Sequence, residues 1–237
     1  MKNILKKLLK RSPEKNLENW FYSWLNAQNT DWRKLCSPQN CYFEFGVGWG
    51  RTMSAFARAA KRYCQDHKAD IKEISIVGFD SFQGLPEKAS PADDHIAWQT
   101  GSFSNSKEIT LKQLEKIGFP LENVMLIEGF FHESLNADTF QKIAHLSPSI
   151  ITLDVDYYSS TQQALDFIAP LLKSGAVFYF DDLWSFHGHP EMGQLKALRE
   201  FHGKKGYLTP CRFFDHNAST YLFSSLEWEY GTKFDIP

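Results

Sequence analysis

The sequence lacks the features that would place the chain in a membrane, an oxidising compartment or a nucleic-acid complex. Its 237 residues include four cysteines, which form neither a CxxC pair nor a zinc-type spacing. No apolar run approaches the roughly 18 residues of a membrane span, and the first residues lack a signal peptide's apolar core and cleavage site. A net charge of −2 gives no overall attraction for nucleic acid. We therefore expect a cytoplasmic protein with reduced thiols and no nucleic-acid partner.

The chain also lacks a linker, an internal repeat and a low-complexity tract, while 43% of its residues are hydrophobic and 15% aromatic. This composition predicts one domain with a well-filled core, residues 36–237, after an N-terminal helical segment, residues 1–35. Residues 1–11 follow helical spacing with one apolar stripe and a basic remainder, which is compatible with an anionic membrane surface. The interpretation we favour is a helix that docks on its own domain or on a second subunit, and we expect a homo-oligomer.

Apolar runs and helical spacings alternate along the chain. Strands are predicted at Cys41–Phe45, Ile74–Phe79, Val124–Ile127, Ile150–Leu153 and Ala176–Phe180, and helices at Thr52–Asp66, Lys107–Ile117 and Thr161–Lys173. This alternation favours an α/β fold, Rossmann-like and doubly wound, with a mostly parallel seven-stranded sheet and helices on both faces. Two further runs, 208–214 and 220–223, flank a turn-rich loop and predict a C-terminal antiparallel strand pair.

A glycine-rich turn follows the first predicted strand, in the stretch EFGVGWGRT that begins at Glu44. Glycines let the backbone turn tightly and approach a ligand, and the helix that follows offers free N–H groups. The dehydrogenase pattern G-x-G-x-x-G would need glycine at position 51, which is arginine. The turn is therefore interpreted either as a ligand-binding turn of another kind or as a purely structural turn in an unrelated α/β protein.

Asp80 ends the second predicted strand and is followed by Ser81. A carboxylate at this position in such folds holds the hydroxyls of an adenosine ribose. Asp80 lies farther from the glycine turn than the about 20 residues of a minimal unit, and the long helix between them accounts for the difference.

Paired carboxylates follow the fourth and fifth predicted strands, Asp154 and Asp156 in ITLDVDYYSST and Asp181 and Asp182 in YFDD. If these strands are neighbours, all four side chains meet at the edge of the sheet where ligands bind. Such a cluster repels itself unless it is protonated or neutralised by a cation. Oxygen ligands select a hard ion such as Mg²⁺, which can orient two hydroxyls and lower the pKa of one of them.

With these motifs the chain resembles the class I S-adenosylmethionine-dependent methyltransferases, and within them the macrocin O-methyltransferase (TylF-type) family, which methylates sugar hydroxyls. The matching stretches are FDSFQGLP (79–86), GSFSNS (101–106), IEGFFHESL (127–135), LDVDYYSST (153–161), YFDD (179–182) and GQLKALREF (193–201). The resemblance covers residues 40–224.

The resemblance implies a set of roles for the residues. The cofactor S-adenosyl-L-methionine would lie on Glu44, Gly46, Val47, Gly48 and Gly50, with Asp80 and Ser81 at the ribose and Gly129 and Phe130 near the adenine. Asp154, Asp181 and Asp182 would hold the metal, and Asp156 would be the catalytic base. Independently of the resemblance, His187 and His189 follow closely after Asp182 and are alternatives for the base or for substrate contacts. Two positions depart from the family pattern: Val155 replaces a usual glycine, and Tyr157 adds an aromatic residue before Tyr158.

The predicted function is a metal-dependent O-methyltransferase that acts on a small-molecule sugar or glycoside. A catechol-like phenol is an alternative acceptor, because the same metal chemistry serves a vicinal diol. The DxD would also suit a metal-dependent glycosyltransferase or a phosphatase, but neither explains the glycine turn together with Asp80, and a phosphatase would carry its DxD after the first strand. A non-catalytic adaptor that keeps the fold is disfavoured by the intact acidic residues.

Overall fold

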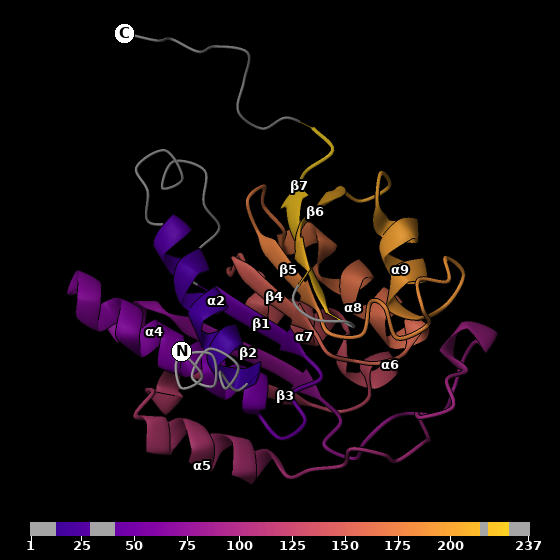
Figure 1. Ribbon diagram of the computed structural model, residues 1–237. Coiled ribbons are helices and arrows are strands. Elements are labelled where there is room, and N and C mark those ends of the chain that lie inside the picture. The colour runs from indigo at the N-terminus through magenta and orange to yellow at the C-terminus, as the bar shows by residue number, and fades with distance from the viewer. Residues whose placement is uncertain (1–12, 29–40, 214–217, 228–237) are drawn as a thin grey trace, which may run out of the picture.

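The computed structural model describes residues 13–28, 41–213 and 218–227 and shows a seven-stranded sheet with helices on both faces (Figure 1). The strands are β1 (Cys41–Phe45), β2 (Ser75–Asp80), β3 (Val124–Glu128), β4 (Ile150–Leu153), β5 (Val177–Phe180), β6 (Tyr207–Phe213) and β7 (Ser219–Ser224). Their order is β3-β2-β1-β4-β5-β7-β6, in which the first five are parallel and β7 runs antiparallel to both neighbours. The predicted fold class is confirmed.

Of the described helices, α2 precedes β1 and the others lie in the connections between strands. They are α2 (Pro13–Gln28), α4 (Arg51–His67), α5 (Lys107–Ile117), α6 (Phe131–Ser134), α7 (Ala137–Ile143), α8 (Tyr158–Ile168) and α9 (Gly193–Phe201), with short 3₁₀ turns at 71–73, 91–93, 121–123 and 169–171. The helix after β4 begins at Tyr158 rather than at Thr161. It changes to a 3₁₀ turn at Ala169 because Pro170 has no N–H for the helical ladder.

Helices α2, α4 and α5 cover one face of the sheet (Figure 1). The apolar residues of α2 recur with helical spacing, and four of them are buried: Leu17, Trp20, Phe21 and Leu25. The Phe21 ring packs edge-on against both Tyr42 of β1 and Phe56 of α4. Part of the predicted N-terminal helical segment therefore contributes to the core, whereas the predicted amphipathic stretch 1–11 lies outside the described residues.

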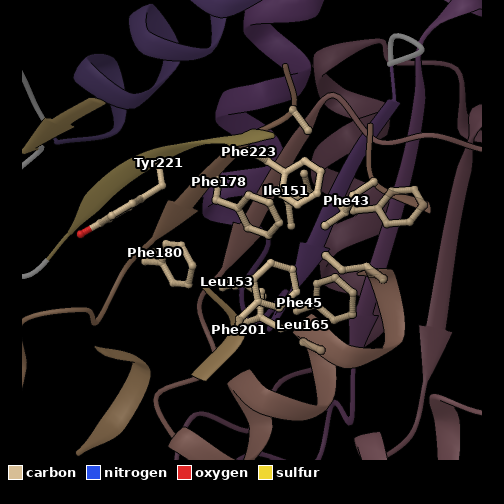
Figure 2. Packing of buried hydrophobic residues seen from close by; sticks show 14 of the residues in the cluster. Phe43, Phe45, Ile151, Leu153, Leu165, Phe178, Phe180, Phe201, Tyr221 and Phe223 are labelled. Carbon is tan, nitrogen blue, oxygen red and sulfur yellow. The ribbon is translucent and has the colours of Figure 1, made fainter. Parts of the chain in front are cut away.

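The opposite face packs against α7, α8 and α9. Strands β1, β4, β5 and β7 send alternate side chains to this face, where Figure 2 shows Phe43, Phe45, Leu153 and Phe178 among Leu165 of α8 and Phe201 of α9. The parallel strands are thus buried on both faces, which explains why their sequences read as continuous apolar runs rather than as alternating patterns.

Two observations bear on the environment of the chain. Cys41 is buried, and burial raises the pKa of its thiol to about 12, which disfavours the reactive thiolate form. Cys36 lies outside the described residues. Among the helices of the described part, none is long and apolar enough to cross a membrane.

Candidate functional site

A cavity of about 410 Å³ opens where β1, β2, β4 and β5 end. These strands are parallel, so their carboxyl ends meet at one edge of the sheet. Ten of the predicted site residues line the cavity: Gly46, Val47, Gly48, Asp80, Ser81, Phe130, Asp154, Asp156, Asp181 and Asp182. Four do not: Glu44, Gly50, Gly129 and His187. The structure therefore brings six of the nine predicted cofactor residues and all three predicted metal residues together in one cavity.

The glycine turn after β1 needs glycine for two different reasons. All three glycines have positive φ angles. At Gly46 (φ +82°) a Cβ would lie 1.7 Å from the carbonyl oxygen of Asp154, so glycine allows β1 and β4 to approach. At Gly48 a Cβ would meet nothing within 4 Å, which leaves the backbone open to a ligand. Gly50 supplies no side-chain cap to α4, whose first residues carry free N–H groups.

Asp80 lies beside this turn, at the end of β2. Its Oδ2 accepts a hydrogen bond from the N–H of Gly48 at 2.8 Å, and its Oδ1 accepts one from the N–H of Phe82. Burial raises the pKa of the Asp80 carboxyl above its ordinary value, and these backbone donors oppose the rise. Asp80 thus links the glycine turn after β1 to the turn after β2, and both turns line this side of the cavity.

Glu44 lies within the sheet rather than in the wall of the cavity. It is fully buried, and its Oε2 accepts a hydrogen bond from the hydroxyl of Tyr42 at 3.0 Å. Its Oε1 has no hydrogen-bond partner among the described residues. Burial raises the pKa of the Glu44 carboxyl well above the ordinary range, and the charges of Asp80 and Asp181 add to the rise. Glu44 thus lies next to the acidic side of the cavity, where burial favours its uncharged form.

The acidic cluster comes from two neighbouring strands. Leu153 of β4 pairs with Phe180 of β5, so the residues that follow them stand side by side. Asp154, Asp181 and Asp182 each offer a carboxylate oxygen, and these three oxygens lie within 4.8 Å of one another. Three carboxylate oxygens at this spacing are suited to one divalent cation.

The electrostatics of the cluster favour protons or a cation. The pKa of the Asp154 carboxyl is held well above its usual value by burial, and next by the charges of Asp181 and Asp182. Burial, followed by the charge of Asp181, raises the pKa of the Asp156 carboxyl to about 7, and a hydrogen bond with Asp182 opposes this rise. A carboxyl with this pKa can release and take up a proton near neutrality.

Side chains outside the cluster hold its members in place. Gln194 of α9, fully buried, donates to the carbonyl of Leu153 at 3.1 Å and accepts from the N–H of Asp182 at 3.0 Å. The hydroxyl of Tyr179 donates to Asp181 Oδ1 at 2.7 Å. Gln194 lies in the stretch GQLKALREF (193–201), which carries part of the family resemblance, but nothing in the sequence indicated that its side chain would bridge the ends of β4 and β5.

The remaining predicted residues lie around the cavity. Gly129 donates its N–H to the carbonyl of Asp80, which ties the end of β3 to β2. His187 is exposed in the turn that follows Trp184, and it does not line the cavity. At the turn after β4 the positive φ belongs to Asp156 (+57°) rather than to Val155, and the valine side chain is buried in the core. The turn therefore forms without the glycine usual in the resembled family.

Several cavity residues were not predicted. Trp49 lies in the glycine turn, Arg51 and Thr52 are the first residues of α4, and Ser160 lies in the first turn of α8. The segment 84–103 supplies a further wall through Gly84, Leu85, Pro86, Trp98, Ser102 and Phe103. The position of Arg51 and Thr52 directly after the glycine turn could have indicated them, because a helix N-terminus there faces the ligand.

The charges in the cavity define what it can bind. Five aspartates and one cation, Arg51, line it. Carboxylates favour a ligand with a positive charge, such as a sulfonium or a metal ion, whereas Arg51 and the N-terminus of α4 favour a carboxylate. The open space at Gly48 and the spacing of the acidic cluster thus fit S-adenosylmethionine and a divalent ion.

The sequence model of the family described as macrocin-O-methyltransferase (TylF) matches residues 43–222. The match includes the glycine turn, Asp80 and the acidic cluster. The chain therefore belongs to the TylF macrocin-O-methyltransferase family.

Individual relatives agree with this family. The chain is 29% identical over 146 residues to an 8-demethyl-8-(2,3-dimethoxy-alpha-L-rhamnosyl)-tetracenomycin-C 4'-O-methyltransferase of Streptomyces olivaceus, covering 59% of this chain and 51% of the relative. The chain thus spans about half the length of that curated relative.

Among solved structures, the calicheamicin methyltransferase CalS11 has a TM-score of 0.67 at 21% identity, over 86% of this chain and 76% of its own. The O-methyltransferase NovP has a TM-score of 0.67 at 18% identity, over 89% and 80%. These two likenesses establish the fold.

Proposed function

We propose that the chain is a metal-dependent O-methyltransferase that transfers the methyl group of S-adenosylmethionine to a hydroxyl of a sugar or glycoside. The observation that carries the proposal is the single cavity in which the glycine turn and Asp80 face the acidic cluster of β4 and β5. Family membership supports the reaction. The name of the Streptomyces olivaceus relative, which specifies a rhamnosyl group, supports a sugar as the acceptor.

On this proposal the cofactor lies along the glycine turn. Arg51, Thr52 and the free N–H groups of α4 would bind its carboxylate, and Asp80 would accept hydrogen bonds from the ribose hydroxyls. Phe130, which follows β3 and precedes α6, would contact the adenine. The absence of a side chain at Gly48 leaves room for this approach.

Asp154, Asp181 and Asp182 would hold Mg²⁺ or a similar ion. When bound, the ion supplies a positive charge that orients adjacent acceptor hydroxyls and lowers the pKa of one of them. Asp156 would accept the proton of that hydroxyl, because its carboxyl lines the same cavity and has a pKa of about 7. His187, exposed and outside the cavity wall, is the weaker candidate for this role.

Two measurements test the proposal. S-adenosylhomocysteine should bind in calorimetry, and methyl transfer to a panel of glycosides should be followed by mass spectrometry with and without EDTA. We expect Asp182→Ala to lose transfer and to retain S-adenosylhomocysteine binding, because the glycine turn and Asp80 are untouched. Full transfer in EDTA or in the variant would remove the metal from the proposal. Binding of a nucleotide-sugar or NAD in place of S-adenosylhomocysteine would refute the methyltransferase assignment.

A further inference from the structure

Asp93 is a fully buried carboxylate in the segment that connects β2 to α5. One of its oxygens, Oδ2, accepts from the N–H groups of Ala89 and Ser90 at 3.0 and 2.9 Å. The same carboxylate accepts from Ser159, 66 residues away in the sequence: the Ser159 N–H donates to Oδ1 and its hydroxyl to Oδ2, both at 2.9 Å. Four donors thus satisfy one buried charge, and two of them belong to α8.

Helix α8 has no cap of its own. Its N-cap residue, Tyr157, makes no side-chain capping hydrogen bond, and a tyrosine is too long and rigid to do so. Ser159 is the second residue of the helix, where the N–H has no partner inside the helix. Asp93 therefore provides, from a distant segment, the acceptor and negative charge that a capping aspartate usually provides locally.

The two parts that Asp93 joins are two walls of the cavity. The connecting segment supplies Leu85 and Trp98, and the turn into α8 supplies Asp156. Leu85, Trp98 and Tyr157 also form a separate buried cluster, in which the Trp98 and Tyr157 rings are 6.2 Å apart. Asp93 does not line the cavity, so it acts on the site only through these walls.

We propose that Asp93 is a positioning residue for the acceptor, because it fixes the connecting segment to the start of α8 and so sets the place of Asp156 relative to Leu85 and Trp98 in the cavity wall. The inference rests on the proposed function. We call the hydrogen-bonded contact between Asp93 and Ser159 the joint. The glycine turn and the Asp80 carboxylate belong to the ends of β1 and β2, so cofactor binding does not depend on this joint.

The main test compares Asp93→Asn with Asp94→Asn. An asparagine offers one acceptor oxygen to four donors and turns an N–H₂ group toward some of them. Asp94 is the neighbouring carboxylate, exposed and paired with Lys88 at 2.7 Å, so its variant removes the same charge without touching the joint. We expect Asp93→Asn to lower kcat/KM for the acceptor at least tenfold while the Kd of S-adenosylhomocysteine stays within threefold. Asp94→Asn should match the wild type in both measurements.

A milder variant keeps the test decisive if Asp93→Asn does not fold. Ser159→Ala removes one of the four hydrogen bonds, and we expect it to raise the acceptor KM about threefold, the effect of one lost hydrogen bond of modest strength. Unchanged acceptor kinetics in Ser159→Ala, or in a folded Asp93→Asn, would overturn the proposal. So would an equal loss of S-adenosylhomocysteine affinity, which would indicate a general structural role.

Hydrogen exchange separates this inference from the proposed function. In Asp93→Asn, amide exchange should accelerate in residues 84–98 and 157–160 and remain as in the wild type in β1 and α4. This result does not require an active enzyme, so it supports the joint even if the wild type methylates no glycoside. Unchanged exchange in those two segments would refute the joint itself, whatever the activity of the wild type.

Discussion

Replacing Asp181 by asparagine should stabilise the protein when divalent ions are absent and abolish its stabilisation by Mg²⁺. Among the neighbouring charges, that of Asp181 acts most strongly on both Asp154 and Asp156. Asp181→Asn removes this charge and keeps an oxygen that accepts from the hydroxyl of Tyr179. The substitution therefore separates the electrostatic cost of the cluster from its packing.

The magnitude follows from the geometry. Two unit charges separated by the 4.8 Å limit of the cluster repel by about 3.5 kcal/mol at an effective dielectric constant of about 20. Asp154 and Asp181 are half-buried, so solvent screens their repulsion, and the raised pKa of Asp154 favours its uncharged form, which lowers the repulsion further. We expect a net gain of about 1–2 kcal/mol in the free energy of unfolding, reduced from the Coulomb value by this screening. In a domain of this size the melting temperature should rise by about 2–8 °C.

The gain should depend on pH. Because the pKa of Asp156 is raised from 3.8 to about 7 in the folded protein, the folded state binds more protons than the unfolded chain between these values. The stability of the metal-free wild type therefore falls as the pH rises from about 4 to about 7. Asp181→Asn should flatten this dependence, so its advantage is larger at pH 8 than at pH 5.

Differential scanning calorimetry in EDTA and in Mg²⁺, at pH 5 and pH 8, measures both effects. An ion at 100 times its Kd should stabilise the wild type by about 2.7 kcal/mol and should leave Asp181→Asn unchanged. Asp166→Asn, an exposed carboxylate on α8, is the control and should behave as the wild type. A variant that is less stable than the wild type in EDTA at pH 8, or that gains as much from Mg²⁺, would refute the reasoning.

Three further predictions concern single residues. Gly46→Ala should fail to give soluble folded protein, because its Cβ would lie 1.7 Å from a backbone oxygen. Gly48→Ala, whose Cβ would meet nothing within 4 Å, should fold but bind S-adenosylhomocysteine more weakly. Circular dichroism measures the folding of each variant, and calorimetry measures the binding. Asp80→Asn should weaken S-adenosylhomocysteine binding by about tenfold, about 1.4 kcal/mol, and equal affinity would contradict the ribose assignment. Gln194→Leu should lower the free energy of unfolding by about 1–3 kcal/mol for each of two unpaired backbone groups, and a melting temperature equal to that of the wild type would show that those groups find other partners.

Local patterns decided which parts of the fold were predictable. The strands Cys41–Phe45 and Ile150–Leu153 and the helix Lys107–Ile117 have the predicted bounds, because continuous apolar runs and helical spacing are properties of adjacent residues. Helices α6 and α7, between β3 and β4, were not predicted. They have four and seven residues, which is too short for the spacing to be recognised.

The sequence by itself determined the order of elements, the glycine turn, Asp80 and the two acidic pairs, because each is a short motif at the end of a strand. Only the tertiary structure decided that β4 and β5 are neighbours and that three carboxylate oxygens therefore lie within 4.8 Å. It also separated Glu44 from the cavity and joined Asp93 to Ser159 across 66 residues. Contacts between distant segments depend on how strands pair and how helices pack on them, and a local pattern of residue types does not predict that pairing.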